Sequence, residues 1–364
     1  MSNLSCGIVG LPNVGKSTLF NALTRKQIPS ENYPFCTIDP NLGIVNVSDP
    51  RLKILSDQTH SKKIVPATVS FVDIAGLVKG ASKGEGLGNQ FLTHIRETDA
   101  IIQVVRCFED ENVIHVSGKV NPLDDIEIIS IELILADLQM AENTLSRLEK
   151  QAKGKKELQP AVDFLKKAVI HLNETQPLRS LKLTEEEEIA SRSYNFITMK
   201  KVLYVCNVGE GDVPSFDNAL VQMVKEYAAK EGSSVVPICA RLEEEISQLD
   251  ENDAKEFLSS LGLKESGLDR LIREAFSLLD LITYITTGEI ETRAWTIKKG
   301  TPADEAAGKI HSDIQKGFIR AEVVSYDDMI QYKGRVGARE AGKARAEGRD
   351  YIMKDGDVVL FFHN

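Results

Sequence analysis

The chain has 364 residues, 42% of them hydrophobic, and a formal net charge of −10 at pH 7. Its length predicts two or three domains, and its apolar runs are shorter than the roughly 18 residues of a membrane span. The acidic balance argues against general coating of nucleic acid but leaves room for a local basic patch.

A phosphate-binding loop stands near the start of the chain. Residues 10–18 read Gly-Leu-Pro-Asn-Val-Gly-Lys-Ser-Thr, after an apolar run at 6–9 that predicts a strand and before helical apolar spacing at 17–25. Strand, glycine-framed turn and helix are the context that this motif requires. Its glycines leave room for a triphosphate, which the loop amides and the helix N-terminus bind. A chance glycine-rich turn is the alternative.

The residues of this loop have separate expected roles. We expect Lys16 to reach the β and γ phosphates and to act in catalysis, and Ser17 to hold Mg²⁺. The set expected to surround the nucleotide is Asn13, Val14, Gly15, Lys16, Ser17 and Thr18.

Two later segments complete the pattern of a triphosphatase. Thr37 follows the first helix, where its hydroxyl can close onto Mg²⁺ when a γ-phosphate is present. Asp73-Ile74-Ala75-Gly76 follows a strand predicted over 65–73. We expect Asp73 to bind a water ligand of the metal and the Gly76 amide to sense the γ-phosphate. Glycines at 79–88 indicate a mobile loop, with a plain surface linker as the alternative.

Further apolar runs predict strands at 100–105, 201–207 and 234–238. Strands that alternate with helices in this way are typical of a doubly wound α/β sheet, with its ligand at the carboxyl ends of the strands. Apolar residues recur at threes and fours over 128–150 and again over 162–172, which predicts an antiparallel helical hairpin. We expect its Leu/Ile stripe to be hairpin packing; a partner-binding face is the alternative.

From about residue 280 the pattern changes to a small α+β module. Strand-like runs stand at 293–297, 321–324 and 357–362, and one helix is expected, capped by Thr301. The predicted domains are therefore 1–128 with 200–279 for the nucleotide, 129–199 for the helical insert, and 280–364 for the terminal module.

These features together resemble the Obg-like ATPases, the YchF group of P-loop proteins. The resemblance includes Asn-Tyr-Pro-Phe-Cys-Thr-Ile-Asp-Pro-Asn at 32–41, residues 73–88, the helical insert and the terminal module. It implies a nucleotide switch that hydrolyses ATP slowly with Mg²⁺. It also implies that residues 280–364 form a TGS domain, a β-grasp fold associated with RNA and ribosome-linked proteins.

The segment expected to read the base departs from guanine-specific relatives. Those carry Asn-Lys-x-Asp, whose Asp accepts two hydrogen bonds from guanine, whereas this chain has Asn207-Val208-Gly209-Glu210. An Asn amide pairs with the N6 donor and N7 acceptor of adenine, in agreement with the ATP preference that the resemblance implies. A strand-end Asn without a reading role is the alternative. We expect Val208 to supply a further contact, and Cys239-Ala240-Arg241, which follows the next strand, to supply backbone contacts to the base.

The group that orients the attacking water is not evident. Ras-type GTPases carry Gln after the glycine equivalent to Gly76, but Leu77 stands here. His115 is one hypothesis, because an imidazole orients water near neutral pH; a packing or loop His is the alternative. Asn13 raises a second hypothesis, since Asn at this loop position accompanies bound K⁺ in related switches. A turn-stabilising Asn is the alternative there.

A basic segment lies within residues 331–350. Six basic residues against three acidic ones leave a charge of +3, and four glycines are interleaved. We expect a loop that faces RNA phosphates, with a solvated surface loop as the alternative. The basic residues are Lys333, Arg335, Arg339, Lys343, Arg345 and Arg349.

The expected setting is reduced and cytoplasmic. The first strand begins within a few residues of Met1, which leaves no room for a signal peptide, and the cysteines are odd in number and scattered. Cys36 lies beside Thr37 and is expected to be a plain loop cysteine. The sequence thus predicts an ATPase switch with ribosomes or rRNA as partner and no membrane. A GTPase translation factor and a nucleotide-sensing scaffold with incidental hydrolysis are the alternatives.

Overall fold

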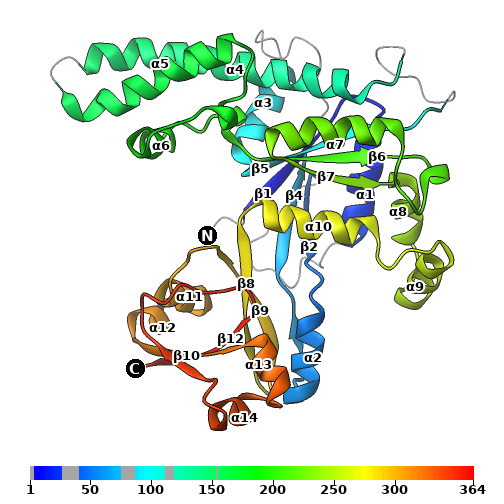
Figure 1. Ribbon diagram of the computed structural model, residues 1–364, viewed down its shortest axis with the longest axis vertical. Coiled ribbons are helices and arrows are strands. Elements are labelled where there is room, and N and C mark those ends of the chain that lie inside the picture. The colour runs from blue at the N-terminus through cyan, green and yellow to red at the C-terminus, as the bar shows by residue number, and fades with distance from the viewer. Residues whose placement is uncertain (1–3, 27–40, 75–86, 111–118, 153–154) are drawn as a thin grey trace. The chain divides into compact units, whose positions relative to one another are not determined.

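The computed structural model describes residues 4–26, 41–74, 87–110, 119–152 and 155–364 (Figure 1). The chain forms two compact units. The first comprises Met1–Gly43 and Ser70–Leu271, and the second comprises Ile44–Val69 and Ile272–Asn364. The three-part division predicted from the sequence stays a prediction beside these two units.

A six-stranded sheet forms the centre of the first unit, with strand order β2-β4-β1-β5-β6-β7. The pairs β4–β1, β1–β5, β5–β6 and β6–β7 are parallel. Every residue of β5 is buried, as expected for a strand covered on both faces. The strands are β1 (Ser5–Val9), β2 (Leu42–Asn46), β4 (Thr68–Asp73), β5 (Ala100–Arg106), β6 (Val202–Asn207) and β7 (Ser234–Ile238).

Helices connect these strands and confirm the α/β class. The predicted helix after the phosphate loop is present as α1. The α-helices of the described part of this unit follow in chain order. They are α1 (Lys16–Arg25), α3 (Leu87–Glu97), α4 (Pro122–Gln151), α5 (Gln159–Asn173), α6 (Glu185–Ser191), α7 (Ala219–Glu231), α8 (Ala240–Ile246), α9 (Glu251–Ser260) and α10 (Gly267–Leu278), which runs on into the second unit.

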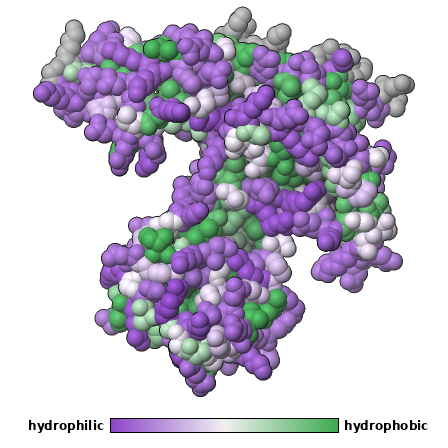
Figure 2. Space-filling view, in the orientation of Figure 1, coloured by the Kyte–Doolittle hydropathy of each residue, from purple (hydrophilic) through white to green (hydrophobic). Residues whose placement is uncertain are grey.

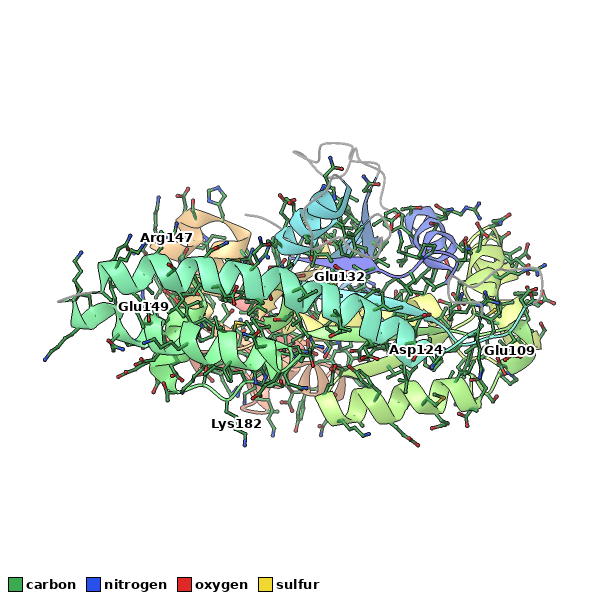
Figure 3. The ribbon with its side chains drawn as sticks, turned by 90° about the horizontal axis from the view of Figure 1, so that it is seen from above. Glu109, Asp124, Glu132, Arg147, Glu149 and Lys182 are labelled. Atoms are coloured by element: carbon green, nitrogen blue, oxygen red, sulfur yellow. The ribbon has the colours of Figure 1, made fainter. Side chains whose placement is uncertain are left out.

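The predicted helical hairpin is formed by α4 and α5, but α4 begins earlier than expected. Asn121 caps it by accepting from the Leu123 amide at 3.2 Å, and Pro122 occupies the first turn, where its missing N–H costs nothing. Figure 3 shows α4 running from the labelled Asp124 past Glu132 to Arg147 and Glu149. One helix therefore belongs both to the body of the first unit and to the hairpin.

The apolar stripe of α4 is divided between two environments. Ile134, Phe164 and Leu165 are buried in the hairpin core, with Leu138 and Leu145 packed against it. Two other members of the stripe, Ile131 and Leu135, are 38% and 42% exposed, so hairpin packing does not account for them. Figure 2 shows a mainly hydrophilic surface over the hairpin on the visible face, with scattered hydrophobic residues.

A second six-stranded sheet, with order β11-β10-β12-β8-β9-β3, forms the second unit. Its first strand comes from far earlier in the chain, because Ile64 pairs in parallel register with Thr292. The predicted strand over 65–73 is wrong in this respect: the run is split at Pro66-Ala67 between β3 here and β4 of the first unit. The strands are β3 (Ile64–Val65), β8 (Leu281–Thr287), β9 (Thr292–Lys298), β10 (Phe318–Ser325), β11 (Arg345–Glu347) and β12 (Asp357–His363).

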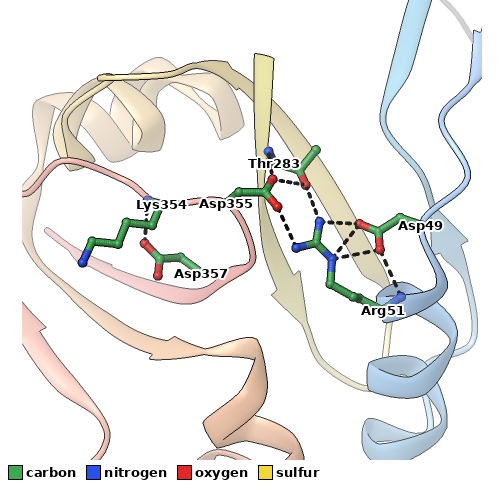
Figure 4. A network of polar contacts seen from close by, with 6 residues as sticks. All are labelled: Asp49, Arg51, Thr283, Lys354, Asp355 and Asp357. Carbon is green, nitrogen blue, oxygen red and sulfur yellow. Dashed lines mark hydrogen bonds and ion pairs between the residues drawn. The ribbon is translucent and has the colours of Figure 1, made fainter. Parts of the chain in front are cut away.

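Several helices accompany this sheet, where one was expected. They are α2 (Pro50–Thr59), α11 (Ala303–Ile310), α12 (Ser312–Lys316), α13 (Tyr326–Gln331) and α14 (Arg335–Glu340). Figure 4 shows how the helix from the early segment is held: the Arg51 guanidinium bonds to Asp49 and Thr283 and pairs with Asp355 at 2.8 Å. These contacts tie α2 to β8 and to the turn before β12.

Two local predictions for this unit are wrong. Thr301 does not cap α11; its hydroxyl donates to the Lys298 carbonyl at 2.7 Å, and Pro302 is the capping residue. The basic segment is not an open loop, because it contains α14 and β11. Glu322 on β10 pairs with Arg335 at 3.0 Å and with Arg339 at 2.8 Å, which neutralises part of its charge.

Candidate functional site

The phosphate-binding loop lies at the carboxyl end of β1, between that strand and α1. Gly15 has φ of 93°, and a Cβ there would collide with the amide nitrogen of Asn207. Only glycine meets both conditions. Asn13 also has a positive φ, of 64°, a conformation that asparagine tolerates better than most residues. The loop thus turns sharply enough to present its amides at the start of a helix, where anions bind.

Lys16 and Asp73 form an ion pair across the site. Lys16 is the first residue of α1, and Asp73 is the last residue of β4, paired in register with Ile8 of β1. Their side chains are 10% and 21% exposed. Ser17 beside them is exposed to solvent. The parallel sheet therefore brings the Asp73 carboxylate to the Lys16 ammonium, 57 residues away in the sequence, with the Ser17 hydroxyl on the next residue of α1.

Asn207 clamps the phosphate loop to the strands behind it. Its Nδ2 donates to the Val14 carbonyl at 2.9 Å, and its Oδ1 accepts from the Ala240 amide, also at 2.9 Å. The residue is 5% exposed. Each end of the amide thus holds a different backbone segment, and one N–H and one oxygen lone pair remain. The predicted reading of adenine by Asn207 stays a prediction beside this observed contact.

The residues around Asn207 continue this edge of the sheet. Val208 is buried, and its amide donates to the Ile238 carbonyl at 2.9 Å. Cys239 and Ala240 follow β7 and are also buried. Burial raises the pKa of the Cys239 thiol, so this cysteine is a poor nucleophile. Asn207, Val208, Cys239 and Ala240 lie close together, as the sequence indicated. Their contacts with a base stay predictions.

Arg106 was missed by the sequence analysis. It ends β5, pairs in register with Asn207, and is 1% exposed. Its Nε donates to the Phe108 carbonyl at 3.0 Å, and its guanidinium lies 4.6 Å from the centre of the Phe108 ring. Arg106 therefore shapes the chain that leaves β5 at this edge. The sequence contains a signal for this residue, because the charged Arg106 directly follows the apolar run at 100–105.

Three of the predicted site residues lie outside the described part of the chain. They are Thr37, Gly76 and His115, and the neighbouring Cys36 and Leu77 lie outside it as well. Their proposed roles stay predictions.

The chemistry of the described residues suits a polyphosphate with a hard cation. Loop amides and the Lys16 ammonium attract phosphate oxygens, while the Ser17 hydroxyl and Asp73 carboxylate are oxygen ligands of the kind that Mg²⁺ prefers. Within the described residues no group of three or more His, Cys, Asp or Glu is placed to hold a metal.

Among the helices of the described ranges, none has the length and apolar character needed to cross a bilayer. Two family models match the chain. One, described as a 50S ribosome-binding GTPase, matches residues 5–143. The other, the C-terminal domain of YchF GTPases, described as a protein of unknown function (DUF933), matches residues 281–364.

The full length of the chain is similar to curated proteins named ribosome-binding ATPase YchF. The protein of Escherichia coli O157:H7 is 56% identical over 360 residues, and that of Bacillus subtilis (strain 168) is 53% identical over 364, with 99% of each chain covered. The structure of the Schizosaccharomyces pombe YchF GTPase matches with a TM-score of 0.88 and 39% identity, over 100% of this chain and 98% of that one.

Proposed function

Because the chain belongs to the YchF family, we propose that it is an ATP-driven switch that binds ribosomes in the cytoplasm and hydrolyses ATP slowly. The observation that carries the proposal is the clamped phosphate loop, with Lys16 and Asp73 paired beside it. Curated relatives at more than half identity over the full length are named ribosome-binding ATPases. The names of these relatives suggest the partner and the reaction, and the phosphate loop with Lys16 and Asp73 is suited to binding the nucleotide.

Mg²⁺ is the proposed cofactor. Ser17 and Asp73 would hold it, Asp73 through a water ligand, with Thr37 joining when a γ-phosphate is bound. When bound, the ion neutralises charge on the phosphate oxygens during transfer. The proposed roles of Gly76 and His115, and of K⁺ beside Asn13, rest on sequence alone; equal hydrolysis rates in Na⁺ and K⁺ buffers would refute the K⁺ proposal.

The names of the relatives do not decide between ATP and GTP, because some are called ATPases and others GTPases. Val208 and Glu210 stand where guanine-specific relatives have Lys and Asp. The free N–H and lone pair of Asn207 are suited to the N7 acceptor and N6 donor of adenine. Such a bidentate reading discriminates between bases by about 1–3 kcal/mol.

Calorimetric titration of ATP and GTP, each with Mg²⁺, tests this choice. We expect ATP to bind at least about tenfold more tightly, which corresponds to about 1.4 kcal/mol. GTP binding as tightly as ATP would favour the GTPase alternative. A hydrolysis-dead variant that kept full cellular function would favour the scaffold alternative.

We propose that the terminal TGS-like module contacts ribosomal RNA through the exposed residues of the basic segment. Since Glu322 already binds Arg335 and Arg339, the available charge lies on the remaining exposed residues. These are Lys333, Lys343, Arg345 and Arg349. Arg345 also pairs with Glu347 at 3.6 Å and bonds to Tyr351, and Arg349 bonds to the Phe318 carbonyl, so the two lysines are the cleaner probes.

The double variant Lys333→Glu/Lys343→Glu tests this contact by ribosome co-sedimentation at several salt concentrations. We expect weaker binding and a shallower salt dependence, because two phosphate contacts are lost. Lys309→Glu with Lys316→Glu, on the neighbouring helices α11 and α12, is the charge-matched control. Unchanged binding in the test variant would favour a merely solvated segment.

A further inference from the structure

The edge of the sheet that carries Asn207 also carries an ion pair that nothing in the proposed function uses. Arg241 Nε lies 3.0 Å from Glu210 Oε1. Glu210 is three residues after Asn207, and Arg241 follows Ala240, whose amide Asn207 holds. The segments that follow two neighbouring parallel strands, β6 and β7, thus carry opposite charges that pair with each other close to the residue expected to read the base.

The backbones beneath both side chains are fixed. Glu210 begins a 3-10 turn (Glu210–Asp212) in which the Asp212 amide donates to the Gly209 carbonyl at 3.1 Å. Asn218 holds the same turn by donating to the Asp212 carboxylate at 3.0 Å. Arg241 lies in the first turn of α8. The backbone positions of both residues are therefore fixed, and the ion pair depends only on the conformations of the two side chains.

We propose that Arg241 is a specificity-determining residue that excludes guanine by occupying the Glu210 carboxylate. This inference rests on the proposed function, in which a purine triphosphate lies at this edge. In guanine-specific relatives the fourth residue of the segment is an Asp that accepts hydrogen bonds from guanine. Glu210 is the equivalent acid here, but its Oε1 is bound to Arg241, which reduces its capacity to accept.

The donors of Arg241 discriminate in the same direction. A guanidinium has five N–H donors and no acceptor. Guanine presents donors at N1 and at its 2-amino group, whereas adenine presents an acceptor at N1 and no 2-amino group. Donors beside this edge of the base are therefore matched by adenine and opposed by guanine. The occupied acid and the direction of hydrogen bonding both act against guanine.

The pair is suited to mutagenesis because it contributes little to stability. The side chains of Arg241 and Glu210 are 76% and 55% exposed, and Arg241 lies 3.8 Å from Glu245 as well. Exposed pairs of this kind are screened by water. Variants of Arg241 are thus expected to fold, and a change in nucleotide choice is then a direct effect.

The experiment measures the affinities of the full chain for ATP and GTP in Arg241→Ala and in Glu210→Ala/Arg241→Ala. In Arg241→Ala we expect GTP to bind about tenfold more tightly, because Glu210 becomes free to accept, while ATP affinity changes less than about threefold. In the double variant most of the gain for GTP should disappear, because the acceptor is gone and only the direct opposition by the Arg241 donors has been removed. Lys255→Ala, which breaks an exposed pair with Glu251 on α9, is the control for loss of one positive charge.

The outcomes separate this inference from the proposed function. A wild-type chain that prefers ATP, with a ratio of affinities in Arg241→Ala within twofold of wild type, overturns the role of Arg241 alone. A gain for GTP that is as large in the double variant as in Arg241→Ala also overturns it, because the gain then does not pass through Glu210. A wild-type chain that prefers GTP overturns the proposed function, and this inference with it.

Discussion

The side-chain amide of Asn207 donates to the backbone carbonyl of Val14 at 2.9 Å, so the end of β6 holds the phosphate-binding loop in place. The same side chain accepts from the Ala240 amide at the start of α8. One buried amide thus joins three segments that are separated by 193 and 33 residues in the sequence. The loop is preorganised by this contact, since its shape does not depend on the loop residues alone.

Asn207→Ala should weaken both the fold and the site. The substitution leaves the Val14 carbonyl and the Ala240 amide without this partner, which costs about 1–3 kcal/mol per buried group left unpaired. We expect nucleotide affinity to fall at least about tenfold as the loop loses its support. Urea unfolding and calorimetric titration measure the two effects. Asn173→Ala, which removes an exposed amide bond to Val169 in the hairpin, should change neither by much.

Gly15→Ala should disrupt the same contact from the other side. A Cβ at Gly15 collides with Asn207, and the φ of 93° is unfavourable for any other residue. We expect a loss of about 1–3 kcal/mol in unfolding free energy and nucleotide affinity too weak to titrate. Gly211→Ala is the matched control, because nothing lies within 4 Å of a Cβ there. Normal nucleotide binding by Gly15→Ala would contradict the account of the loop.

Asp73→Asn should impair hydrolysis and raise the concentration of Mg²⁺ that it requires. The neutral amide is a weaker partner for Lys16 and a poorer acceptor for a water ligand of Mg²⁺. We expect hydrolysis to fall by about 10²-fold, with a higher Mg²⁺ concentration needed for the remaining activity, and chelation of Mg²⁺ to abolish turnover in wild type. Steady-state rates over a Mg²⁺ titration measure this. Asp57→Asn, at an exposed pair with Lys53, should behave as wild type.

The phosphate loop was predictable because its determinants are local. Nine consecutive residues, with an apolar strand before them and a helix after them, specify the turn without help from the rest of the chain. The shared location of Lys16 and Asp73 was predictable for a related reason, since both lie at the carboxyl ends of neighbouring strands of one parallel sheet. The end of each strand is a local feature, and the parallel sheet brings such ends together.

Features that depend on distant partners were not predictable. Nothing within residues 44–69 indicates that they join 272–364, because the pairing of Ile64 with Thr292 is chosen by the partner strand. The count of charges over 331–350 omitted Glu322, which lies outside that window in the sequence yet binds two of its arginines. The sequence identified Asn207 as a candidate for reading the base. Its contact with Val14 was not predictable, because the two residues meet only in the folded sheet.

Glu322 should make the terminal module sensitive to acid. Its hydrogen bond from Arg339 is the main cause that lowers the pKa of this carboxyl, with Arg335 adding to it. Because the pKa is lower in the folded state, the stabilisation is fully present above the ordinary Glu value and is lost as pH falls through the folded value. We expect Glu322→Gln to lose about 1 kcal/mol at pH 7.

Amide exchange of α14 at several pH values measures this loss as local opening. The difference in the opening free energy of α14 between wild type and Glu322→Gln should be constant from pH 7 down to about 5. It should become smaller below the ordinary Glu pKa of about 4.3. Glu340→Gln, an exposed acid on the same helix, controls for net charge. A difference that grew on acidification would mean that Glu322 does not act through its charge.

Asp137 should be the most sensitive position of the helical insert. Its carboxylate has no exposed surface and accepts from the Thr198 amide at 2.7 Å and from the Thr198 hydroxyl at 2.8 Å, with Arg96 at 3.4 Å. Burial raises the pKa of this carboxyl more than these partners lower it. Asp137→Ala leaves buried donors unpaired, and we expect a loss of about 3–5 kcal/mol in unfolding free energy.

Arg96→Leu should cost less than Asp137→Ala, because it removes only the partner on α3 and leaves the bonds to Thr198 intact. Urea unfolding followed by circular dichroism orders the variants, and Glu142→Ala, an exposed acid on α4, should stay close to wild type. If Arg96→Leu proved as damaging as Asp137→Ala, the charge pair rather than the bonds to Thr198 would hold the insert. The order of the two losses therefore decides what joins the hairpin to the body of the first unit.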